Sequence, residues 1–189
     1  VVIGAMRAGT TTLYEMMRTT KMVSMPRMKE TDFFLGRQFP RGLKWFNAQF
    51  DDVEKPLIDV SPNYAKVYRF PEVAQRIHAT NPNAKLVYVV RDPIKRALSE
   101  FRHLTAMGYD QKFPHETKPC IGECVGDGSR YYDQIQAYLK YWPMDQIEII
   151  EFEDLIQDQW GTLRDLFDRL GLPPFHHIDK PVHTNSSRE

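Results

Sequence analysis

Near the start of the chain, two glycines flank a short turn between an apolar run and a helical pattern. Residues 4–12 read Gly-Ala-Met-Arg-Ala-Gly-Thr-Thr-Thr. In a strand–turn–helix unit of this kind, the backbone N–H groups of the turn and the helix N-terminus together bind anions. Arg7 adds a cation, and Thr10, Thr11 and Thr12 add hydroxyls, so the pattern predicts an anion site. The glycines alone are equally consistent with a tight turn that binds nothing.

This turn differs from the phosphate loop of nucleoside-triphosphate enzymes at one position. That loop continues with a lysine that contacts the terminal phosphates and a hydroxyl residue that holds magnesium. Here Thr10 stands where the lysine belongs. The sequence therefore favours a shorter anion over a triphosphate with magnesium. A nucleoside or metabolite kinase of the P-loop class remains the alternative, because it shares the strand, the glycine spacing and the helix.

A second candidate anion site follows the most apolar segment of the chain. Residues 85–90 predict a strand covered on both faces, Arg91 follows it directly, and Ser99 lies eight residues later in a helical pattern. Ligands of open α/β sheets bind outside the carboxyl ends of the strands, so we expect Arg91 and the glycine turn to face one crevice. A guanidinium with a hydroxyl suits a terminal phosphate. An ion pair of Arg91 with Asp92 or Glu100 is the competing interpretation.

Both elements resemble those of sulfotransferases that use 3′-phosphoadenosine 5′-phosphosulfate (PAPS). Residues 1–12 look like the loop that binds the 5′-phosphosulfate, and residues 91–99 contain the complete RDPxxRxxS pattern of the 3′-phosphate element. The resemblance covers almost the whole chain, including residues 59–64, 81–86 and 149–155, and points to the heparan-sulfate-type enzymes and bacterial proteins like them. It implies a P-loop-type three-layer α/β fold with a central parallel sheet flanked by helices.

The resemblance also implies how the donor is bound. The 5′-phosphosulfate would be held by Arg7, Ala8, Gly9, Thr10, Thr11 and Thr12, and the 3′-phosphate by Arg91 and Ser99. Arg7 would stabilise the leaving oxygen, although the glycosaminoglycan branch of the family usually has a lysine there. No metal is required where cations neutralise the transferring group. The expected product is 3′-phosphoadenosine 5′-phosphate (PAP).

The base that removes the acceptor proton has two candidates. Residues 29–34 resemble the KExxFF element of the family, in which the glutamate is the base, and this makes Glu30 the first candidate. His103 is the second, because it lies one helical turn beyond Ser99 and imidazole titrates near neutral pH. Without the resemblance, Glu30 reads as an ordinary surface carboxylate and His103 as a structural histidine.

Candidate contacts to the acceptor are Lys29, Ser61 and Asn63. Relatives often have a lysine immediately before this serine, where Val60 stands here, so that charge is absent or is supplied by Lys29 or Lys55. The expected acceptor is a hydroxyl or amine of a carbohydrate or small metabolite. The missing lysine also leaves open a catalytically inactive carbohydrate-binding module.

These residues need an alternating framework of strands and helices to bring them together. Residues 1–3, 21–25, 57–60, 85–90 and 147–150 predict strands, and helical patterns begin near residues 10, 71, 93, 131 and 159. This alternation predicts an α/β layered sheet. The length of 189 residues predicts a single domain that covers residues 1–189. Residues 108–128 predict an irregular loop or insertion, and residues 185–188 look like the start of a nucleotide-contacting region.

Composition limits the classes of partner that we expect and does not indicate the cellular compartment. The 25 basic and 25 acidic residues cancel, which disfavours nucleic-acid binding. No apolar run approaches the roughly 18 residues of a membrane span, so we expect no membrane contact by this domain. Cys120 and Cys124 have no partners at zinc-site spacing, and their redox state is open. A bacterial enzyme of this kind would be cytoplasmic, and a membrane-anchored eukaryotic one would lie in the Golgi lumen.

Overall fold

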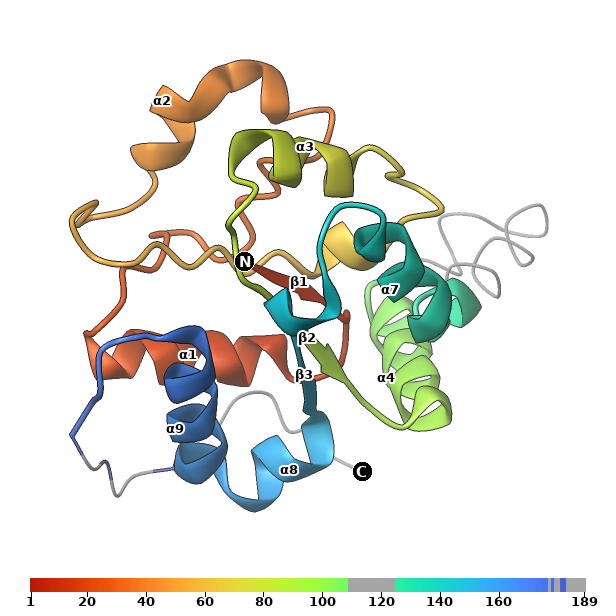
Figure 1. The fold of residues 1–189 in the computed structure, drawn as a ribbon. Helices are drawn as coiled ribbons and strands as arrows, with labels where there is room; N and C mark the ends of the chain where they lie inside the picture. The colour runs from red at the N-terminus through yellow and green to blue at the C-terminus, as the bar shows by residue number, and fades with distance from the viewer. Residues whose placement is uncertain (109–124, 177, 179–180, 183–189) are drawn as a thin grey trace.

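A three-stranded parallel sheet in the order β1–β2–β3 lies at the centre of the computed structural model (Figure 1). The structure describes residues 1–108, 125–176, 178 and 181–182. The strands are β1 (Val2–Gly4), β2 (Leu86–Val90) and β3 (Ile147–Glu151). The predicted strand at residues 85–90 is the central one, which confirms its expected place.

The apolar sequence of β2 explains its central position. Leu86, Val87, Tyr88 and Val89 are all buried, as side chains on both faces of a covered strand must be. Beside it, β1 and β3 pair in parallel, and the register places Tyr88 opposite Ile149. All three strands therefore present their carboxyl ends at one edge of the sheet.

Helices cover both faces of this sheet and give the predicted three layers (Figure 1). Helices α1 (Thr10–Thr20) and α9 (Gln159–Leu170) lie on one side, and α3 (Val73–Thr80) and α7 (Tyr131–Leu139) on the other. Helix α4 (Pro93–Ala106) leaves the end of β2. The shorter elements are η1 (Phe39–Arg41), α2 (Gly42–Asn47), η2 (Pro62–Ala65), η3 (Met144–Gln146) and α8 (Phe152–Gln157).

Helix α4 begins and ends as its sequence predicts. The side chain of Asp92 accepts a hydrogen bond from the backbone N–H of Lys95 at 2.8 Å, and Pro93 occupies the first helical position. Gly108 lies beyond the last turn with φ 69°, a left-handed conformation that favours glycine. The helix thus starts directly after Arg91.

Two of the predicted strands are wrong. Residues 21–25 and 57–60 form only isolated parallel bridges, Ser24 with Leu57 and Val60 with Val2. Prolines at positions 56 and 62 bracket the second segment and remove backbone donors, so the ladder cannot continue. Helix α7 ends at Leu139, four residues before Pro143.

Several predicted features lie outside the described residues. The expected loop at 108–128 is described only at residue 108 and from residue 125 onward. Cys120, Cys124 and residues 185–188 also lie outside the described part of the chain.

Candidate active site

The glycine turn between β1 and α1 is closely packed. Gly9 has φ 91°, and a Cβ at this position would lie 2.6 Å from Cδ2 of Phe152. Any other residue would therefore suffer both backbone strain and a clash. Gly4 is equally constrained, because its Cβ would lie 2.6 Å from Cβ of Ala65. The turn has this shape because only glycine fits at its two ends.

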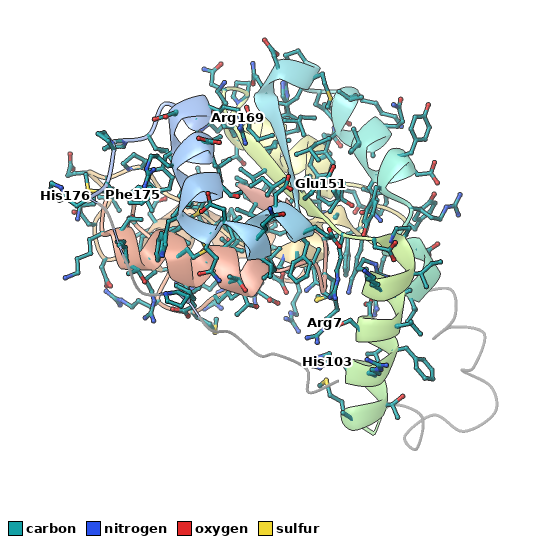
Figure 2. All side chains as sticks on the ribbon, turned by 90° about the horizontal axis from the view of Figure 1, so that it is seen from below. Arg7, His103, Glu151, Arg169, Phe175 and His176 are labelled. Carbon is teal, nitrogen blue, oxygen red and sulfur yellow. The ribbon has the colours of Figure 1, made fainter. Side chains whose placement is uncertain are left out.

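Arg7 joins the turn to helix α4. Its Nε donates to Oγ of Ser99 at 3.2 Å, and Figure 2 shows Arg7 beside α4. Arg7 adopts a left-handed backbone with φ 66°, which is uncommon for a residue with a side chain. Burial is the main cause that lowers the pKa of the Arg7 guanidinium. The charge of Glu100 opposes this shift, and the charge of Arg91 adds to it. The structure thus brings two predicted donor-binding residues into direct contact.

Arg91 faces the same turn. Its Nη1 donates to the carbonyl oxygen of Arg7 at 3.4 Å, and its guanidinium carbon lies 4.3 Å from the ring centroid of Phe152. The Tyr131 hydroxyl donates to the Arg91 carbonyl at 2.8 Å and accepts from the Arg91 N–H at 3.3 Å. The Nε atom of Arg91 is buried without a hydrogen-bond partner. A buried donor of this kind fits an anion, because an unpaired buried polar group is otherwise costly.

The competing ion pairs of Arg91 do not form in the described part of the chain. Asp92 caps helix α4, and Glu100 pairs with Arg96. The side chain of Arg91 is therefore directed to the glycine turn and not to these two carboxylates.

Arg96 is a residue of this site that the sequence analysis did not single out. Its side chain is fully buried, and it forms an ion pair with Glu100. It also donates to Met6 O at 3.2 Å, to Ser129 Oγ at 2.6 Å and to the carbonyl of Val125. Arg96 thereby ties the glycine turn to α4 and to residues 125–129. The signal in the sequence for Arg96 is its place as the second arginine of the RDPxxRxxS pattern.

Lys29 and Glu30 are the candidate residues for the acceptor side of the reaction. Nζ of Lys29 pairs with Oε1 of Glu30, whose side chain remains 33% exposed. Glu30 has φ 65° and Asp32 has φ 49°, so the backbone of this turn is left-handed at two residues with side chains. Such conformations cluster at functional sites, because the surrounding structure must compensate for their strain.

Hydrogen bonds anchor this turn beside β1. The N–H of Asp32 donates to Oγ of Ser61 at 3.1 Å, and Ser61 donates to Oδ1 of Asp59 at 2.9 Å. Asn63 donates to both carboxylate oxygens of Asp32, at 3.1 and 3.3 Å. Ser61 itself follows the segment bridged to β1, and its N–H donates to Val2 O at 3.1 Å. Ser61 and Asn63 therefore position the turn, and Ser61 is fully buried.

Burial raises the pKa of Asp32 to about 6, and the charges of Glu30 and Asp59 add to this shift. The hydrogen bond from Asn63 and the charge of Arg37 oppose it. The folded protein thus binds this proton more tightly than a free carboxyl does, and ionisation of Asp32 costs stability as the pH rises from about 4 to about 6.

Replacing Asp32 with Asn is expected to raise the melting temperature above pH 6 by about 2 °C, a small value because the group is partly exposed. Melting curves from pH 4 to pH 8 measure this, with the exposed Asp145→Asn as control. The difference should vanish near pH 4, where wild-type Asp32 is also neutral. An equal difference at pH 4 and pH 8 would show that the charge is not its cause.

The remaining candidate residues lie as follows. His103 is exposed on α4 and lies closer to the C-terminal end of this helix than Ser99, where Arg7 contacts it (Figure 2). Val60 is fully buried. Lys55 forms an exposed ion pair with Asp52 at 3.5 Å. Lys29 alone of the two lysines contacts a candidate catalytic residue.

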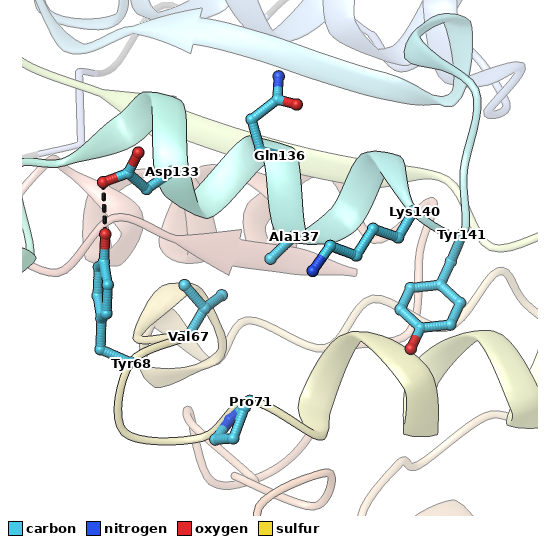
Figure 3. A pocket seen from close by; sticks show the side chains of 8 residues that line it. All are labelled: Val67, Tyr68, Pro71, Asp133, Gln136, Ala137, Lys140 and Tyr141. Carbon is cyan, nitrogen blue, oxygen red and sulfur yellow. Dashed lines mark hydrogen bonds between the residues drawn. The ribbon is translucent and has the colours of Figure 1, made fainter.

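A hollow of about 340 Å³ lies between α7 and the segment that follows η2 (Figure 3). The Tyr68 hydroxyl donates to Asp133 at one end of it. Its lining comprises Val67, Tyr68, Pro71, Asp133, Gln136, Ala137, Lys140 and Tyr141. None of the predicted site residues lines it, so it is separate from the glycine turn.

Two features are absent from the described residues. These residues contain no group of three or more His, Cys, Asp or Glu side chains arranged to hold a metal ion. None of their helices has the length and apolar character needed to span a membrane.

Comparisons with known proteins identify a family. The model of the sulfotransferase family matches residues 38–177. A bifunctional heparan sulfate N-deacetylase/N-sulfotransferase of Drosophila melanogaster is 26% identical over 92% of this chain and 20% of its own length. Heparan sulfate glucosamine 3-O-sulfotransferase 5 of Mus musculus is 25% identical over 92% of this chain and 53% of its own length. The chain thus spans at most about half of these relatives.

A solved structure shares the fold. The sulfotransferase from Alicyclobacillus acidocaldarius superposes with a TM-score of 0.79 over 98% of this chain and 85% of its own, at 21% identity. The sulfotransferase domain from the curacin biosynthetic pathway gives a TM-score of 0.63 over 91% of this chain and 73% of its own, also at 21% identity.

Proposed function

The chain belongs to the sulfotransferase family, and on that basis we propose that it transfers the sulfuryl group of PAPS to a hydroxyl or amine of a carbohydrate or small metabolite. One observation carries the proposal. Arg7 contacts both Ser99 and Arg91, so the glycine turn and the start of α4 lie against each other. Two arginines at such a junction suit a ligand with two anionic groups, as PAPS has.

The proposed donor site uses the residues of these two elements. The N–H groups of residues 8–12 and the side chain of Arg7 would hold the 5′ end. Arg91, with its unpartnered Nε, and Ser99 would hold the 3′-phosphate. PAPS would supply an activated sulfuryl group, and the cations would make a metal unnecessary for charge neutralisation.

The chemistry then falls to two side chains. Glu30 accepts the proton of the acceptor hydroxyl or amine while the oxygen or nitrogen of the acceptor forms a bond to sulfur. Arg7 stabilises the charge that develops on the bridging oxygen as the bond from this oxygen to sulfur breaks. The products are the sulfated acceptor and PAP. Lys29 holds the Glu30 carboxylate, and Ser61 and Asn63 hold the turn from which it projects.

Calorimetric titration with PAP and with ATP plus magnesium tests the donor. The proposal predicts that PAP binds more tightly, whereas preference for ATP plus magnesium would favour the kinase alternative. Incubation with labelled PAPS and a panel of glycans, peptides and lipids then tests transfer. Tight PAP binding without transfer to any acceptor would favour the inactive binding module.

Replacing Arg91 with Ala is expected to weaken PAP binding by about 10- to 100-fold, because charge-assisted hydrogen bonds to the 3′-phosphate are lost. The affinity for adenosine 5′-phosphate, which lacks that phosphate, should change little. Calorimetry measures both, and the exposed Arg102→Ala on α4 is the matched control. Equal loss for the two nucleotides would argue against the assigned role of Arg91.

A further inference from the structure

Phe152 lies where the two anion-binding elements meet. It is the first residue of α8 and directly follows β3, whose last residue Glu151 pairs with Val90 of β2. Since these parallel strands end in register, the residues that follow them, Arg91 and Phe152, emerge side by side. The sheet register alone therefore brings this ring to the edge where the ligand is expected.

One ring lies against both Arg91 and the glycine turn. The guanidinium carbon of Arg91 lies 4.3 Å from its centroid, and the ring occupies the space that a Cβ on Gly9 would need, with Cδ2 2.6 Å from that position. Phe152 is half-buried, so its other contacts do not enclose it completely. The rigid ring of Phe152 consequently sets the spacing between the glycine turn and the side chain of Arg91.

The guanidinium of Arg91 has few other restraints. Its hydrogen bond to Arg7 O is long at 3.4 Å, and its Nε has no partner. Tyr131 fixes the backbone of Arg91 but not its side chain. A guanidinium stacked on an aromatic face keeps its N–H edge available, so the stack orients the donors without occupying them.

We propose that Phe152 is a positioning residue for the 3′-phosphate: its ring orients Arg91 and sets the spacing between Arg91 and the glycine turn. The proposal rests on the donor site proposed above. It concerns recognition of a ligand with anions at both ends, and it assigns Phe152 no contact with the reacting atoms.

The test is the ratio of the dissociation constants for adenosine 5′-phosphate and PAP, measured by calorimetry. Phe152→Leu keeps an apolar side chain but removes the aromatic face, and the ratio is expected to fall roughly 3- to 30-fold. Phe152→Tyr keeps the face and should retain the wild-type ratio. Phe175→Leu, which removes a half-buried ring packed on Trp160 and Phe167, is the control for general loosening.

A double-mutant cycle separates positioning from stability. In an Arg91→Ala background, Phe152→Leu should leave the ratio unchanged, because there is no guanidinium left to orient. If Phe152→Leu weakens the binding of both nucleotides equally, or of neither, the ratio is unchanged and the inference is wrong. The proposed donor site is unaffected by that outcome. A wild-type protein that does not prefer PAP to adenosine 5′-phosphate would instead refute the proposed function itself.

Discussion

Replacing Glu30 with Gln is expected to lower kcat by about 10²- to 10⁴-fold, the usual contribution of a general base. The amide has the size of the carboxylate but cannot accept the acceptor proton. The turn should keep its shape, because its anchors run through Asp32, Ser61 and Asn63 and not through the Glu30 side chain. PAP affinity should therefore stay within about twofold of wild type.

Steady-state rates at saturating PAPS and acceptor, together with PAP titration, measure this prediction. His103→Ala is the informative companion, because His103 is the other candidate base and is exposed on α4. We expect that variant to retain most of its turnover. Full activity of Glu30→Gln combined with an inactive His103→Ala would transfer the role to the histidine.

The elements that the sequence predicted correctly are those whose signals are local. Glycine spacing, the apolar run of β2 and the cap of α4 each depend on neighbours within one turn or strand. The rule that parallel strands end at one edge then predicted that Arg91 and the glycine turn would lie close together. The contact between Arg7 and Ser99, 92 residues apart, is consistent with that arrangement.

Features that depend on long-range pairing could not be predicted in this way. Phe152 meets Arg91 only because of the register between β2 and β3, which the sequence does not state. Ser61 was expected to contact the acceptor, but its hydroxyl is used by Asp59 and Asp32 in the folded chain. Polar residues after a strand are thus ambiguous until their partners are known.

Arg96 shows that the role of a charged residue is equally ambiguous in the sequence. Two arginines stand five residues apart in one motif, and composition treats them alike, yet Arg91 stacks on Phe152 and Arg96 is fully buried. Buried arginines require several acceptors, and those of Arg96 come from residues 6, 100, 125 and 129. Only the fold brings these acceptors together.

Replacing Arg96 with Ala is accordingly expected to lower the free energy of unfolding by about 3–5 kcal/mol, because it leaves Glu100 buried without its partner. The carbonyl of Met6 loses its donor in the same step, which loosens the glycine turn. Urea denaturation followed by far-ultraviolet circular dichroism measures the change, and Arg102→Ala on the exposed side of α4 is the control. A loss below about 1 kcal/mol would contradict the predicted cost of the unpaired charge.

The double variant Arg96→Met with Glu100→Leu distinguishes the cost of an unpaired charge from the value of the pair. If desolvation dominates, it should be more stable than Arg96→Ala, since apolar residues of similar size often replace a buried ion pair with little loss. PAP binding should remain impaired in the double variant, because neither apolar side chain donates to Met6 O or faces Arg7 with a negative charge. Recovered stability without recovered PAP affinity would therefore assign the buried pair a role in shaping the donor site, whereas recovery of both would leave it a purely structural one.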